Sequence, residues 1–276
     1  MSRRRFLVSL LGLPTLARAA EDAAPAWVPA MRKVHARFTG RPGTLALFGD
    51  SITHSLAFWA PLAYGRKNMT KDAETALTRV SKRLRMECWR DWRGPAYGNQ
   101  GSMTVRWADD NVDAWLKKLN PETAVILFGT NDLTSVPLDE YEAKLRSVVR
   151  RCLANGTVVI LTTLPPRSGL LDRTKRFAEA IRRVAADAQV PLCDYFAEVL
   201  RRRPDDWDGA AAQWKRYATY EVPTLIAGDG VHPSNPAKYA GDYSAESLRS
   251  SGYGLRNVLT LLSYSEVIRH VLSPDR

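Results

Sequence analysis

The chain has few cysteines and no long apolar run, and each shortage excludes a class of protein. Three cysteines among 276 residues cannot make a disulfide framework, so a hydrophobic core must stabilise the fold. They show neither a Cys-x-x-Cys nor a Cys/His ligand spacing, so buried free thiols are their expected state. Beyond residue 20 no stretch approaches the roughly eighteen uncharged apolar residues of a membrane span, so we expect no stable membrane insertion.

The first twenty residues have the pattern of an export signal. An arginine-rich head precedes a short apolar run from Phe6 to about Leu16, and Ala17-Arg18-Ala19 is a small-x-small cleavage sequence. Two adjacent arginines followed one residue later by Phe-Leu resemble the twin-arginine signal. We therefore expect residues 1–20 to be a signal peptide that is cleaved near Ala19-Ala20. The mature chain is then expected in the periplasm or outside the cell.

The composition is that of an ordinary globular protein, with 45% hydrophobic and 25% charged residues. Forty basic residues against 29 acidic ones give a net charge of +11. Acidic residues are interleaved among the basic ones, and neither an aromatic RNA-binding signature nor a zinc pattern is present, so we expect no nucleic-acid partner. A basic exported protein more readily meets anionic polysaccharide or the cell envelope.

Short apolar runs alternate with helix-like stretches after a leader at residues 21–40 that has no clean period. Continuous rather than alternating hydrophobicity indicates strands covered on both faces, and the alternation predicts a three-layer α/β domain with a parallel sheet. No repeat or composition break divides residues 41–276, so we expect a single domain. The strands are predicted at 44–48, 124–128, 157–164 and 190–196, and the helices at 71–85, 139–153, 171–188 and 253–271.

In such sheets ligands bind beyond the carboxyl ends of the strands, so the residues that follow each apolar run are candidates for chemistry. Gly49-Asp50-Ser51-Ile52 follows the first run, and a serine there can present both its hydroxyl and its backbone N–H. Gly129-Thr130-Asn131-Asp132 follows the second, where a side-chain amide can face a developing oxyanion. Taken singly, the first is more often an ordinary turn and the second a helix cap.

Two further loops supply the missing parts of such a site. The loop at residues 98–104 contains two glycines, and the second, Gly101, can turn a backbone N–H toward the same point. Near the chain's end, Asp229 stands three residues before His232 on one tight loop. The carboxylate can therefore hold the imidazole Nδ1–H and leave Nε2 as a base. Together the four segments provide a nucleophile, a base with its orienting acid, and three oxyanion donors: the N–H groups of Ser51 and Gly101 and the side chain of Asn131.

These four segments, in this order, resemble the four blocks of the SGNH (GDSL-type) hydrolases over residues 44 to about 236. The resemblance implies a flavodoxin-like fold with about five parallel strands, esterase or lipase-type activity, and neither metal nor nucleotide cofactor. It assigns Ser51 as nucleophile, His232 as base and Asp229 as its orienter, with Gly101 and Asn131 completing the oxyanion hole. The second block is thinly represented, so Gly98 remains an alternative to Gly101.

About fifty residues separate Ser51 from Gly101, which is longer than in compact members of that family and indicates an insertion around residues 65–97. Trp89, Trp92 and Arg93 within it are candidates for substrate binding, because indole rings stack on sugar faces and arginine can hold an acidic group. The alternative is that they are core and solvated surface.

We therefore expect an exported serine esterase that removes acetyl or other short acyl groups, with carbohydrate as the expected carrier. A lysophospholipase or thioesterase of the same fold is the alternative within this class, and a non-catalytic polysaccharide-binding protein is the alternative outside it. Acyl transfer to a sugar instead of water would use the same residues.

Overall fold

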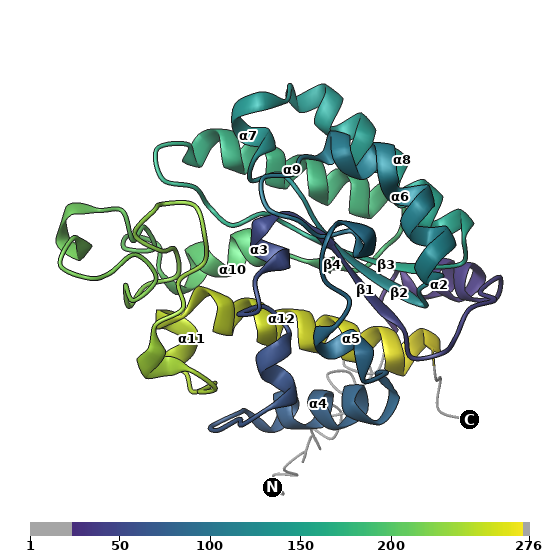
Figure 1. Cartoon of the computed structure of the whole chain (residues 1–276), viewed down its shortest axis with the longest axis horizontal. Coiled ribbons are helices and arrows are strands. Elements are labelled where there is room, and N and C mark those ends of the chain that lie inside the picture. Colours follow the sequence, from purple (N-terminus) through teal and green to yellow (C-terminus); the bar gives the residue numbers. More distant parts are fainter. Residues whose placement is uncertain (1–23, 273–276) are drawn as a thin grey trace, which may run out of the picture.

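The computed structural model describes residues 24–272, and it confirms the α/β class with a parallel sheet (Figure 1). The strands are β1 (Leu45–Gly49), β2 (Thr123–Leu127), β3 (Val158–Thr162) and β4 (Leu192–Cys193), in that spatial order. In the register of the sheet, Leu47 lies opposite Val125, and Val125 lies opposite Ile160. The expected signal at residues 1–20 lies outside the described part of the chain.

The sheet differs from the expectation at both of its edges. Within residues 24–272 it has four strands, and the far side of β1 carries only an isolated parallel bridge between Gly49 and Asn99. At the other edge the fourth run was expected to extend to Phe196, but β4 stops at Cys193. The carboxylate of Asp194 accepts a hydrogen bond from the Ala197 N–H and thereby caps the next helix.

Helices cover both faces of the sheet in three layers (Figure 1). Helix α6 packs on α8, which packs on α9, and on the other side α12 packs on α4. The four predicted helices form close to their expected positions, whereas α6, at residues 105–119, was not predicted. The longer helices are α2 (Val28–His35), α4 (Lys71–Arg83), α6 (Val105–Leu119), α8 (Leu138–Ala154), α9 (Leu171–Asp187), α10 (Tyr195–Arg202) and α12 (Gly252–Val267).

Short helical turns complete the chain. They are α3 (Ser51–His54), α5 (Glu87–Arg90), α7 (Asp132–Ser135) and α11 (Ser247–Ser250), the 3-10 turns Ala60–Ala63, Pro95–Tyr97, Ala212–Trp214 and Ala237–Tyr239, and a π-helical turn at Ile268–Leu272. Helix α2, in the segment expected to be a leader, packs against the π-helical turn and buries Val28, Met31 and Val34. None of the helices between residues 24 and 272 is long and apolar enough to cross a membrane.

The core fills the space between the sheet and the helix layers. Phe48 of β1 packs against Trp115 of α6, with their ring centroids 5.1 Å apart. On the opposite side Trp59 is fully buried and stacks on Trp89 at 5.3 Å. All three cysteines are buried free thiols, and burial raises the pKa of Cys88 and Cys152 to about 12. The core therefore supports β1, whose carboxyl end leads into α3.

Candidate active site

Ser51 lies at the first position of α3, directly after β1. The preceding residue, Asp50, caps this helical turn, because its Oδ1 accepts a hydrogen bond from the Ile52 N–H at 3.0 Å. The Ser51 side chain is partly exposed, and its Oγ lies 2.9 Å from Nε2 of His232. A residue from the end of the first strand thus meets one 181 positions later in the chain.

The loop of residues 228–233 holds the imidazole of His232 from its other nitrogen. Nδ1 of His232 lies 2.8 Å from Oδ2 of Asp229, while Oδ1 of Asp229 accepts the backbone N–H groups of Val231 and His232 at 2.9 Å. Partial burial acts to raise the pKa of Asp229, but the hydrogen bonds from His232 and these N–H groups outweigh it and hold that pKa below its ordinary value. An ionised Asp229 can therefore keep Nδ1 protonated and leave Nε2 to accept a proton from Ser51.

The three expected oxyanion donors lie on the loops that border Ser51. Nδ2 of Asn131 donates one hydrogen bond to the Met103 carbonyl oxygen at 2.9 Å, which orients the amide and leaves its second N–H. Within residues 24–272, the backbone N–H groups of Ser51 and Gly101 donate no hydrogen bond. These groups are therefore available to a ligand oxygen.

The two glycines of the 98–104 loop differ in their surroundings. The N–H of Gly98 donates to the Pro95 carbonyl oxygen at 3.2 Å, and a Cβ on Gly98 would lie 2.2 Å from the Phe48 ring. Gly98 also has a φ of +81°, so it serves a tight turn packed against the core. A Cβ on Gly101 would meet no atom within 4 Å. The role of Gly101 as the donor stays a prediction, and its N–H, unlike that of Gly98, donates no hydrogen bond within residues 24–272.

Asn99 is a structural residue of this site that the sequence analysis missed. Its side chain is fully buried, and Nδ2 donates to the carbonyl oxygens of Leu47 and Trp92 at 3.0 and 3.1 Å. Its Oδ1 accepts the Gly94 N–H at 3.0 Å and lies 3.2 Å from Nδ1 of His54. Asn99 thus fastens the loop that carries Gly101 to β1. The only sequence signal was its position between the glycines.

Buried carboxyl groups flank two of the candidate residues, Asp50 beside Ser51 and Asp132 beside Asn131. Burial raises the pKa of Asp50 to about 6 and that of Asp132 to about 7, and the negative charge of Asp50 further raises the pKa of Asp132. Each carboxyl accepts one backbone hydrogen bond through Oδ1, that of Asp132 from the Val105 N–H at 2.9 Å. Within the described residues, the Oδ2 atom of each is buried without a hydrogen-bond partner. This corner of the site therefore favours neutral carboxyl groups.

Two arginines hold the end of α3. Arg256 is fully buried, and it donates to the Ile52 carbonyl oxygen at 2.7 Å and to Oγ1 of Thr53 at 2.9 Å. Its guanidinium lies over the Phe58 ring at 3.5 Å from the centroid. Burial lowers the pKa of Arg256 to about 10. No local pattern in the sequence points to Arg256, because these partners lie 204 and 203 residues away along the chain.

The second arginine is Arg93, expected from the sequence to bind substrate. Its guanidinium donates instead to the carbonyl oxygens of Thr53, Ser55 and Phe58, at 2.6, 3.0 and 2.7 Å. Burial lowers its pKa to about 10. Arg93 thus stabilises the turn after Ser51 from within.

The structure also locates the two tryptophans of the insertion. Trp89 is only 6% exposed, and its stacking on Trp59 places it in the core, away from any sugar. Trp92 is partly exposed and stacks on Tyr97, so a role for it in binding stays a prediction. Tyr220, which the sequence analysis passed over, is 45% exposed and meets His232 edge-on at 6.1 Å. Tyr220 is therefore the aromatic side chain that borders the base.

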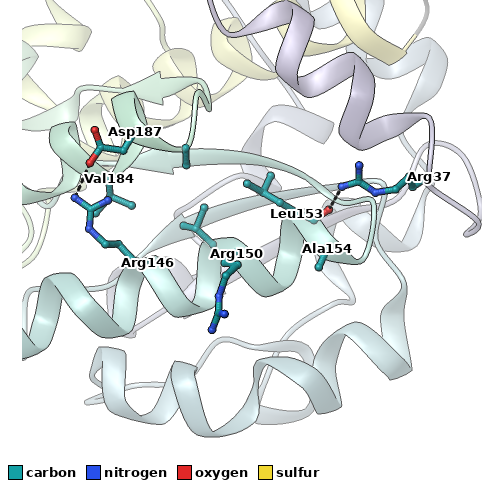
Figure 2. Close-up of a pocket in the computed structure, with 9 residues that line it drawn as sticks. Arg37, Arg146, Arg150, Leu153, Ala154, Val184 and Asp187 are labelled. Carbon is teal, nitrogen blue, oxygen red and sulfur yellow. Dashed lines mark hydrogen bonds and ion pairs between the residues drawn. The ribbon is translucent and has the colours of Figure 1, made fainter.

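Hollows of about 430 to 510 Å³ lie elsewhere on the surface, and no residue of the triad lines them. Figure 2 shows the one between α8 and α9, of about 460 Å³, where Arg146 pairs with Asp187 and Arg37 donates to the Leu153 carbonyl oxygen.

The chain resembles known proteins in its fold and in its sequence family. No curated protein matches the chain. An alpha/beta hydrolase enzyme from the metagenome of Lake Arreo, Spain, shares its fold with 18% identity and a TM-score of 0.51, covering 83% of this chain and 99% of that one. A lipase/acylhydrolase from Enterococcus faecalis has 15% identity and a TM-score of 0.50, covering 80% of this chain and 94% of that one. A catalytic mutant of an acetylxylan esterase from Geobacillus stearothermophilus has 18% identity and a TM-score of 0.50, covering 82% of this chain and 96% of that one. Residues 47–237, more than half of the chain, match the GDSL-like lipase/acylhydrolase family. The chain therefore belongs to the GDSL-like lipase/acylhydrolase family.

Proposed function

We propose that the protein is a serine esterase that works through an acyl-enzyme intermediate. The observation that carries this proposal is the continuous chain of short contacts from Ser51 Oγ to His232 Nε2 (2.9 Å) and from His232 Nδ1 to Asp229 Oδ2 (2.8 Å). A serine hydroxyl with a base at hydrogen-bond distance, and an acid that orients the base, is the arrangement required for nucleophilic attack on an ester.

In the proposed mechanism, Ser51 Oγ attacks the ester carbonyl carbon while Nε2 of His232 takes its proton. The N–H groups of Ser51 and Gly101 and the Asn131 amide stabilise the tetrahedral oxyanion. His232 then gives the proton to the leaving alcohol, which leaves an acyl group on Ser51. A water molecule activated by His232 repeats the cycle and releases the acid.

The substrate in this proposal is an acetyl or short acyl ester of a carbohydrate. An exported protein meets polysaccharides, and residues 1–20 are proposed to direct export to the periplasm or the exterior. Tyr220 supports a carbohydrate substrate in this proposal, because its exposed ring lies beside His232 and a sugar can stack on it.

A lipid-directed activity is the second candidate, favoured by one observation. Leu56, five residues after Ser51, is 53% exposed and lines an apolar hollow of about 430 Å³ together with Pro61 and Tyr64. An acyl chain that reached this hollow would make longer esters the better substrates.

The test is hydrolysis of p-nitrophenyl acetate and p-nitrophenyl octanoate by the mature chain, with the Ser51→Ala variant beside it. We expect turnover that disappears in Ser51→Ala and that favours acetate. A preference for octanoate would support the lipid candidate. If neither ester is turned over in a Ser51-dependent way, the esterase proposal fails, and a polysaccharide-binding protein or an acyltransferase that rejects water takes its place.

A further inference from the structure

The loop that follows β3 places an arginine between the two halves of the active site. Nη1 of Arg167 donates to the carbonyl oxygen of Thr130 at 2.8 Å, and Thr130 directly precedes Asn131. The next residue, Ser168, donates its backbone N–H to the Gly230 carbonyl oxygen at 2.9 Å, two positions before His232. Arg167 is therefore held against the oxyanion loop on one side, and its neighbour is held against the loop of the base on the other.

The charge of Arg167 is not neutralised by the protein. Within the part of the chain that the structure describes, no carboxylate lies at ion-pair distance from it, whereas Arg106 and Arg182 each pair with one. Its single hydrogen bond uses one of the five N–H donors of the guanidinium. The side chain is half-buried, and a charged hydrogen bond made by its remaining donors would be stronger there than in open water.

We propose that Arg167 binds a carboxylate on the substrate, and that the natural substrate is a short-chain ester of an acidic alcohol, such as an acylated acidic sugar. A guanidinium fork matches the two oxygens of a carboxylate. We place the carboxylate on the alcohol part, because the proposed acetyl group carries no charge. This proposal rests on the esterase function proposed above and specifies its substrate class.

A purely structural role makes a different prediction. Through its bond to the Thr130 carbonyl oxygen, Arg167 also supports the backbone next to Asn131. If that were its whole contribution, its loss would slow the hydrolysis of every ester by the same factor. If it binds a carboxylate, its loss would act on anionic esters alone.

The kinetic test compares 4-acetoxybenzoate with its uncharged methyl ester, each corrected for its hydroxide-catalysed hydrolysis. The variants are Arg167→Gln, Arg167→Lys, and as a control Arg150→Gln, which removes an exposed arginine on α8 that makes no ion pair within the described residues. We expect Arg167→Gln to lower kcat/KM about tenfold or more for the anionic ester and less than threefold for the methyl ester. Arg167→Lys should retain part of the preference, and Arg150→Gln all of it. An equal loss on both esters would overturn the proposal.

The binding test does not depend on turnover. The Ser51→Ala protein is titrated with the same two esters, followed by NMR, with and without the Arg167→Gln change. Tighter binding of the anionic ester that disappears in the double variant supports the proposal, and equal binding of both esters in Ser51→Ala contradicts it. If carboxylate binding is seen but the wild-type protein hydrolyses neither ester, the esterase function fails while the anion site stands. Melting curves of each variant show whether it is folded.

Discussion

Arg256 Nη1 donates a hydrogen bond of 2.7 Å to the carbonyl oxygen of Ile52, the residue that follows Ser51. The two residues are 204 positions apart in the sequence. The same guanidinium binds Thr53, and its positive charge acts to lower the pKa of Asp50, the residue that caps the turn. Helix α12 thereby holds the turn that carries Ser51.

Replacing Arg256 should destabilise the protein strongly. Arg256→Met leaves the buried acceptors on Ile52 and Thr53 unpaired, so we expect the free energy of unfolding to fall by about 2 to 5 kcal/mol. Denaturant titration measures this, with Arg150→Met as the exposed control, which should stay within about 0.5 kcal/mol of wild type. A loss below 1 kcal/mol for Arg256→Met would show that the contact is dispensable.

Asn131→Ala should slow the chemical step without weakening substrate binding. Loss of one oxyanion donor typically costs about 2.7 to 4 kcal/mol in the transition state, so kcat should fall roughly a hundred- to a thousandfold with little change in KM. Steady-state kinetics on p-nitrophenyl acetate provide the measurement. Thr134→Ala, an exposed change on the same short helix α7, is the control. A kcat within threefold of wild type would remove Asn131 from the oxyanion hole.

Asp132→Asn should flatten the dependence of stability on pH. The folded pKa of Asp132 is about 7 and the ordinary value is 3.8, so between these values the folded state keeps a proton that the unfolded state has lost. The resulting stabilisation is complete below about pH 4 and is lost as the pH rises through about 7. Asparagine can keep the hydrogen bond from the Val105 N–H and cannot ionise.

Urea titrations at pH 5 and pH 8 test this prediction. From pH 5 to pH 8 the free energy of unfolding of the wild-type protein should fall by on the order of 1 to 3 kcal/mol more than that of Asp132→Asn. Asp139→Asn, an exposed change on α8, should follow the wild-type curve. Equal losses in Asp132→Asn and wild type would mean that Asp132 is ionised throughout this range.

The two glycines of the 98–104 loop should respond differently to alanine. At Gly98 a Cβ meets the Phe48 ring and the φ of +81° disfavours any side chain, so Gly98→Ala should lower the free energy of unfolding by about 2 kcal/mol or more. Gly101→Ala keeps the backbone N–H and has space for the methyl group, so its melting temperature and activity should remain near wild type. The melting temperatures of both variants, measured by thermal unfolding, test this difference. A stable Gly98→Ala protein would contradict the assigned packing.

The sequence was informative where the physical signal is local. Continuous apolar runs placed β1, β2 and β3, and the helix expected at 139–153 is found as α8. The fourth strand was predicted too long because Tyr195 and Phe196 are apolar in a helix as well as in a strand. Only the cap at Asp194 distinguishes the two.

Part of the candidate site could be predicted from the sequence, because some of its contacts are local. Asp229 and His232 stand on one loop, and their contact follows from their spacing. The roles of Asn99, Arg256 and Arg93 depend on carbonyl oxygens that approach them only in the folded chain, at Leu47, Ile52 and Thr53. Arg93 was a candidate for substrate binding, because nothing in the sequence indicates that backbone oxygens would use its donors.

The triad joins a very local contact to a very distant one. Asp229 and His232 are three residues apart, whereas His232 and Ser51 are separated by 181. The carboxylate–imidazole pair can therefore assemble early in folding at little entropic cost, but the nucleophile reaches it only when both ends of the chain have come together. In partly folded molecules the Asp229–His232 pair could be formed while the Ser51 hydroxyl is still out of its reach. Any activity of these three residues is therefore absent until the topology is complete.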